Sequence, residues 1–99
     1  MLNIEKTANA AETTLALTGR LDTATAPELE AVIRQSLQGV TALNIDMKAL
    51  EYISSAGLRV LLSAQKIMNK QGEMKVTHVN DTIMEIFEIT GFSDILTIG

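Results

Sequence analysis

The chain has 99 residues, of which 46% are apolar, and this is enough hydrophobic material for one compact domain spanning residues 1–99. Twelve acidic against eight basic residues give a formal net charge of −4, which argues against binding to the phosphate backbone of nucleic acids. Cysteine is absent and histidine occurs once, so disulfides, thiolate zinc sites and a cysteine nucleophile are excluded, and we expect no metal or other cofactor.

The sequence contains no segment that indicates a membrane or an export route. Its longest apolar run is far shorter than the ~20 residues of a membrane-spanning helix. The first residues do not combine a basic start with an apolar core, as a signal peptide would. We therefore expect a cytoplasmic protein that does not insert into membranes.

The first predicted elements are two short strands joined by a turn. Apolar residues alternate with small or polar ones at residues 2–4 and 14–18, which is typical of half-buried strands. The polar residues 9–12 predict the turn between them. Residues 19–22, which include a glycine and an aspartate, are predicted to break the second strand.

A helix and a third strand follow. Thr25 can cap the helix, with Pro27 in the first turn and Glu28 three residues after the cap, as in a capping box. Gly39 stands where helices commonly end. Residues 42–47 alternate as a strand. The apolar stripe of the helix consists of Leu29, Val32, Ile33 and Leu37.

The longest predicted helix begins after a connecting turn at residues 50–53. Residues 56–68 carry two apolar stripes side by side, so we expect this helix to be packed on more than one side and to lie centrally. Gly72 ends it.

The remaining elements are a strand, a helix and a last short strand. Residues 73–78 alternate as a strand, and Asn80 or Asp81 can cap a helix that Gly91 ends. Residues 94–98 predict the last strand. The order is β-β-α-β-α-β-α-β, which predicts a small mixed α/β sheet with helices mainly on one face, because helix-linked strands favour parallel neighbours.

Two hydroxyl groups, those of Ser54 and Ser55, lie at the predicted N-terminus of the long helix. A hydroxyl at this position can cap the helix, which is worth about 1 kcal/mol. It could also accept a phosphoryl group, because the unpaired N–H groups and the helix dipole tolerate negative charge there. The residues alone leave both interpretations open.

Four segments in order resemble the STAS domains of bacterial anti-sigma factor antagonists. Residues 50–61, LEYISSAGLRVL, resemble the family signature, and residues 19–22, GRLD, resemble its Gly-x-Leu-Asp turn. Residues 72–74, GEM, resemble its glycine step into the next strand, and residues 86–92, IFEITGF, its late Phe and Gly block. Together they span nearly the whole chain.

The resemblance implies a binding protein rather than an enzyme. Members of the family bind an anti-sigma factor that is also a GHKL-type serine kinase, and so release the sigma factor. The kinase phosphorylates a serine of the antagonist, which ends the complex, and a serine phosphatase resets it. Alignment on Gly57 and Leu58 assigns the phosphoacceptor position to Ser55, and Ser54 stands where many members carry aspartate.

The resemblance also implies a partner-binding surface around the acceptor. Two compatible roles are open for Asp22. It can contact the partner as part of that surface, and it can equally act as a cap or as the start of an Asx turn. The predicted partner-binding residues are Asp22, Thr23, Ser54, Ser55, Ala56 and Gly57.

Two other functions fit parts of the sequence. A serine hydrolase would need a glycine where Ile53 stands, and the only candidate base, His78, has no evident orienting partner, so we set it aside. STAS domains also serve as docking subunits of lipid-transport ATPase complexes or of sensory scaffolds, and this alternative stays open.

Overall fold

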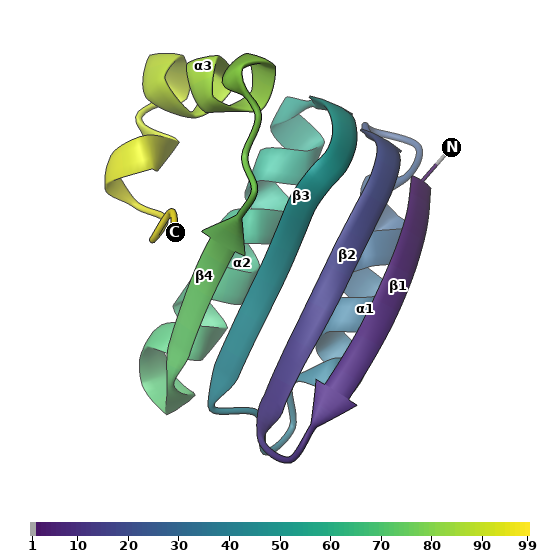
Figure 1. Ribbon diagram of the computed structural model, residues 1–99, viewed down its shortest axis with the longest axis vertical. Helices are drawn as coiled ribbons and strands as arrows, with labels where there is room; N and C mark the ends of the chain where they lie inside the picture. Colours follow the sequence, from purple (N-terminus) through teal and green to yellow (C-terminus); the bar gives the residue numbers. More distant parts are fainter. Residues whose placement is uncertain (1) are drawn as a thin grey trace.

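The computed structural model describes residues 2–99, and within them four strands and three α-helices follow one another along the chain (Figure 1). A short 3-10 helix, η1, comes last. The bounds are β1 Leu2–Asn9, β2 Glu12–Leu21, α1 Ala26–Ser36, β3 Ala42–Ile53, α2 Ser55–Gln71, β4 Glu73–Thr77, α3 Asp81–Thr90 and η1 Phe92–Asp94.

The strands form one mixed sheet in the order β1-β2-β3-β4. β1 and β2 are antiparallel, whereas β2, β3 and β4 run parallel. This confirms the predicted mixed α/β class and the order of the elements. The strand predicted at residues 94–98 is reduced to a single parallel bridge between Ile98 and Val76. Its first residues are instead the end of η1 and the turn that follows η1.

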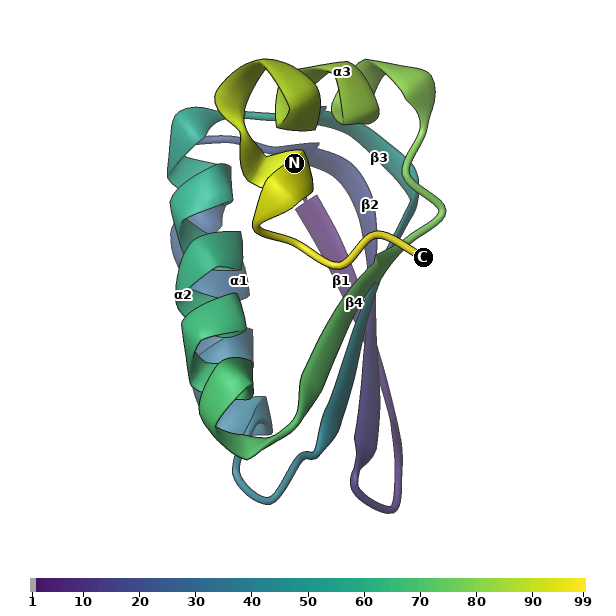
Figure 2. The same ribbon diagram turned by 90° about the vertical axis from the view of Figure 1, so that its left-hand side faces the viewer.

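Helices α1 and α2 cover one face of the sheet, and α3 lies across one end (Figure 2). Helix α2 packs against α1, β3 and β4, as its two apolar stripes predicted. No helix in residues 2–99 is long and apolar enough to cross a membrane.

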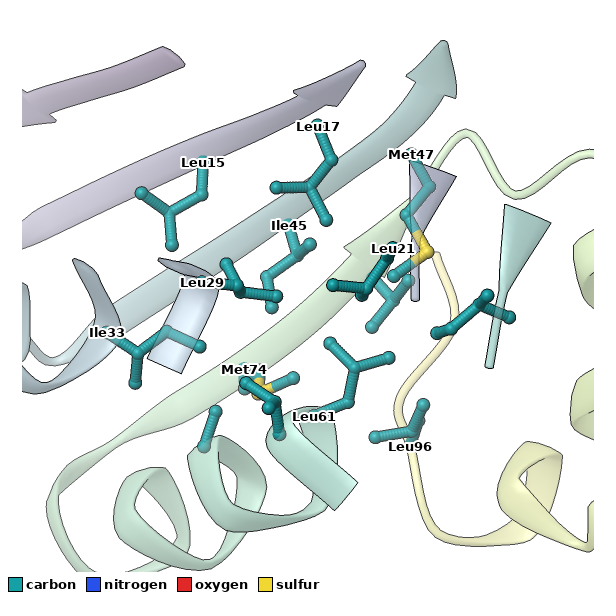
Figure 3. Close-up of a cluster of buried hydrophobic side chains, with 14 of the residues drawn as sticks. Leu15, Leu17, Leu21, Leu29, Ile33, Ile45, Met47, Leu61, Met74 and Leu96 are labelled. Carbon is teal, nitrogen blue, oxygen red and sulfur yellow. The ribbon is translucent and has the colours of Figure 1, made fainter. Parts of the chain in front are cut away.

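The core fills the space between the sheet and the two helices (Figure 3). Alternate strand residues such as Leu15 and Ile45 point at the helices and are fully buried. The core side chains labelled in Figure 3 are Leu15, Leu17, Leu21, Leu29, Ile33, Ile45, Met47, Leu61, Met74 and Leu96.

Strands β2 and β3 are longer than predicted. β2 continues through residues 19–21, and the predicted turn at residues 50–53 belongs to β3. The register between the strands shifts between Ala16 and Thr18 and again between Gly19 and Arg20, and at each shift β3 contributes one extra residue. Such bulges break the period-2 alternation without ending the strand, which is why the pattern indicated a turn.

The hairpin turn between β1 and β2 lies where predicted. Asn9 pairs with Glu12, so two residues form the loop. The first of them, Ala10, has a φ of 55°, in the left-handed region that costs an L-residue free energy.

Candidate functional site

The site lies at the end of the molecule where β2 and β3 finish and α1 and α2 begin (top of Figure 1). The backbone N–H of Ser54 donates a hydrogen bond to the carbonyl oxygen of Leu21, with 2.9 Å between the atoms. The two segments that were singled out in the sequence are therefore joined directly. In open α/β sheets this end, beyond the carboxyl ends of the strands, is where ligands commonly bind.

Asp22 organises the turn from β2 into α1. Its Oδ1 accepts hydrogen bonds from the backbone N–H groups of Ala24 at 3.0 Å and Thr25 at 3.1 Å, which is an Asx-type turn. These bonds, that from Thr25 above all, lower the pKa of the Asp22 carboxyl from its usual value of 3.8. Thr23, next in the chain, is exposed.

The capping box predicted at Thr25 is wrong. The Thr25 hydroxyl makes no cap hydrogen bond to α1. It donates instead to the carbonyl oxygen of Arg20 at 2.9 Å and accepts from the N–H of Asp22 at 2.8 Å. The buried Thr25 side chain thus holds the turn that carries Asp22.

Arg20 and Tyr52 border this turn, and no sequence pattern indicated a role for either residue. The second bulge pairs them across β2 and β3, and the Arg20 guanidinium carbon lies 4.4 Å from the centre of the Tyr52 ring. The Arg20 Nε also lies 3.9 Å from Oδ2 of Asp22. Only the bulged register brings these residues together.

At the start of α2 the two serines take different roles. Ser54 is the N-cap, and its Oγ accepts a hydrogen bond of 3.4 Å from the N–H of Gly57. Ser55 is the first helical residue and is exposed. Within residues 2–99 its hydroxyl takes part in no side-chain hydrogen bond. The capping role therefore falls to Ser54, and the Ser55 hydroxyl faces solvent.

Gly57 allows α2 to approach the ends of β2 and β3. A Cβ on Gly57 would lie 2.7 Å from Cγ of Leu21 and 3.0 Å from Cγ1 of Ile53. A real Cβ at such distances would force its neighbours to move. The glycine therefore sets how closely Ser54 and Ser55 lie to the Asp22 turn.

A hollow of about 200 Å³ separates the first turns of α1 and α2. Thr23, which precedes α1, and Ala56, in the first turn of α2, are two of the predicted partner-binding residues, and both border it. Arg59 and Glu30, which the sequence analysis did not select, also border it. The complete lining is Thr23, Ala26, Pro27, Glu30, Ala56, Arg59 and Val60.

His78 does not belong to this site. It lies one residue beyond the end of β4, although residues 73–78 were predicted as the strand, and its φ is 55°. Its Nδ1 lies 3.1 Å from Oδ1 of Asp46. Asp46 alternates in β3 with buried core residues, so this pair lies on the face of the sheet away from the helices.

Comparison with known proteins gives consistent matches. The family model described as "Mlab, STAS domain" matches residues 4–97. BtrV of Bordetella bronchiseptica, a candidate anti-sigma factor antagonist, is 38% identical over 85 residues, which are 84% of this chain and 73% of that protein. The anti-sigma-B factor antagonist of Staphylococcus aureus is 32% identical over 100 residues, covering 99% of this chain and 93% of that protein.

Solved structures share the fold. An anti-sigma factor antagonist from Mycobacterium paratuberculosis superposes with a TM-score of 0.89 at 22% identity, covering 99% of this chain and 85% of that one. The phosphorylated form of SpoIIAA, a Bacillus cell fate determinant, gives a TM-score of 0.66 at 16% identity, covering 100% and 91%. From the family model and these relatives, the chain belongs to the STAS domain family, among the anti-sigma factor antagonists.

Proposed function

We propose that this protein is an anti-sigma factor antagonist that binds an anti-sigma factor and thereby releases a sigma factor. The observation that carries the proposal is the hydrogen bond between Ser54 and Leu21, which unites the Asp22 turn with the start of α2. Two relatives that are named as anti-sigma factor antagonists and match 84% and 99% of the chain support it. In this proposal a single STAS domain, residues 1–99, binds the anti-sigma factor. We assign the protein to the bacterial cytoplasm, where transcription takes place.

The partner-binding surface in this proposal combines the Asp22 turn with the first turn of α2. Thr23 and Ser55 supply exposed polar groups, and Ala56 with the neighbouring hollow supplies a shallow apolar recess. Gly57 contributes through the close approach of α2 rather than by direct contact, because it is buried. The net charge of −4 suits a partner with basic contacts, so association should slow as salt rises.

Phosphorylation of Ser55 ends the complex in this proposal. An anti-sigma factor with a GHKL-type kinase site transfers the γ-phosphoryl group of ATP to the Ser55 oxygen, ADP leaves, and the hydroxyl proton is released. The exposure of Ser55 in the first turn of α2 supports this role. The added charge of about −2 is compatible with the fold, since helix N-termini favour anions, so binding is lost at the interface.

A serine phosphatase completes the cycle by hydrolysing the phosphoserine at residue 55. Water attacks phosphorus, inorganic phosphate leaves, and the Ser55 hydroxyl is restored. The same exposure that admits a kinase admits the phosphatase.

The test is calorimetry with the purified chain against every anti-sigma factor of the same genome that has a GHKL-type ATP site. We expect one of them to bind with 1:1 stoichiometry, and Ser55→Ala to bind equally well. Subunits of lipid-transport ATPase complexes are measured alongside. Binding to such a subunit with none to any anti-sigma factor would overturn the proposal in favour of a docking role.

A further inference from the structure

Arg59 lies one helical turn after Ser55 on α2. Both residues are exposed, and a spacing of four residues brings their side chains to the same strip of the helix surface, with Cβ atoms about 6 Å apart. The acid-bearing position precedes the basic one, which is the favourable order for such a pair. A phosphoryl group on Ser55 would therefore lie within reach of the Arg59 guanidinium.

The Arg59 guanidinium is not committed to another ion pair within residues 2–99. Glu30 of α1 also borders the hollow, and its Oε1 lies 3.6 Å from Nη2 of Arg34. Asp22, in the turn between β2 and α1, lies near Arg20. Arg59 thus borders the hollow as a cation without an ion-pair partner among residues 2–99, whereas the carboxylate of Glu30 is already paired.

We propose that Arg59 binds the phosphoryl group once Ser55 carries it, and that this internal ion pair moves the guanidinium away from the hollow. The inference rests on the proposed function, in which Ser55 is the phosphoacceptor. Phosphorylation then changes the binding surface twice: a dianion appears at residue 55, and a cation leaves the recess formed with Thr23 and Ala56. Arginine suits this role because its planar fork binds phosphate oxygens bidentately.

The experiment measures the second pKa of the phosphoserine, which is near 6 in free peptides. Phosphoserine is installed at residue 55 of the full chain during translation, and its phosphorus resonance is followed by NMR against pH. The variants are Arg59→Gln, Arg59→Lys and, as the matched control, Lys66→Gln. Lys66 is exposed on the same strip of α2. It lies three turns and about 16 Å beyond Ser55 along the helix, which is farther than the ~8 Å Debye length at physiological salt.

We expect the pKa of the phosphoserine to rise by about half a unit in Arg59→Gln, because the cation that favours the dianion is lost. The rise is small because the ion pair is exposed. Arg59→Lys should give a smaller rise, since it keeps the charge and loses the fork. Lys66→Gln should match the original chain. Equal pKa values in the original chain and Arg59→Gln would overturn the inference, as would an equal rise in Lys66→Gln.

This result is separable from the proposed function. Because the phosphoserine is installed without a kinase, the titration gives its answer even if no kinase modifies Ser55. Conversely, equal titrations would remove the role of Arg59 and leave Ser55 as the proposed acceptor.

Discussion

The hydrogen bond from the Ser54 N–H to the Leu21 carbonyl oxygen, 2.9 Å long, joins the last residue of β2 to the residue that caps α2. Asp22 follows one of these residues and Ser55 follows the other. Any shift of α2 relative to β2 therefore changes the distance between the two parts of the proposed binding surface.

Replacing Ser54 by aspartate should separate capping from electrostatics. Serine and aspartate are similar N-caps, so Ser54→Asp should lie within ~0.5 kcal/mol of the original chain in unfolding free energy. Phosphorylation by the cognate kinase should become faster, because a carboxylate close to the reacting oxygen alters the electrostatics of the transition state. Initial rates with both proteins test this. Equal rates would show that Ser54 acts only as a cap.

Gly57→Ala should destabilise the domain. Alanine favours a helix by about 1 kcal/mol over glycine, but its Cβ would lie 2.7 Å from Cγ of Leu21. Overpacking of this kind typically costs about 1–3 kcal/mol, so we expect a net loss of about 1 kcal/mol in urea unfolding. The loss should become smaller when Gly57→Ala is made in a Leu21→Ala background, because the closest clashing atom is gone and only the contact of 3.0 Å with Cγ1 of Ile53 is left. An unchanged loss in that background would contradict the contact.

Asp22→Asn should make stability less sensitive to acid. The pKa of Asp22 is lowered in the folded state, so its stabilising effect is complete above the ordinary value of 3.8 and is lost as the pH falls through the folded value. Asparagine keeps an oxygen for the turn but does not titrate. Unfolding free energies measured between about pH 5 and pH 2 should therefore fall less steeply in the variant. Parallel curves would contradict the role of the carboxylate.

Ala10→Gly should stabilise the β1–β2 hairpin. Ala10 has a φ of 55°, where an L-residue is strained and glycine is not, so we expect a gain of about 0.5 kcal/mol after the entropy of the unfolded chain is counted. Ala11→Gly is the control, because Ala11 is the neighbouring loop residue and has no positive φ. This variant should lose about 0.5 kcal/mol of unfolding free energy. Thermal unfolding of both distinguishes them, and a loss in both would contradict the strain at Ala10.

The sequence was sufficient for the architecture because the core follows simple periods. Leu15 and Leu17 alternate in β2, and the two stripes of α2 required a helix packed on several sides. The bulges were not predictable, because the buried residues Met47, Leu50 and Ile53 are three apart. That spacing does not match the period of a regular strand, and only pairing with β2 shows how it is accommodated.

The candidate site was predictable only in part, for the same reason. The family resemblance selected Asp22 and Ser55, which the fold brings to one end of the sheet. It did not select Arg20 or Tyr52, whose contact depends on the bulged register. Thr25 was misassigned because its hydroxyl bonds to the strand before the helix, a tertiary contact that no local capping rule contains.

The most direct test of the central claim is native mass spectrometry of the chain mixed with its anti-sigma factor, before and after addition of ATP. We expect a 1:1 complex without phosphorylation, and after ATP the free chain with one phosphoryl group that fragmentation maps to Ser55. Ser55→Ala should remain in the complex under both conditions. A phosphoryl group on Ser54 or Thr23, or a complex that survives with Ser55 phosphorylated, would contradict the account.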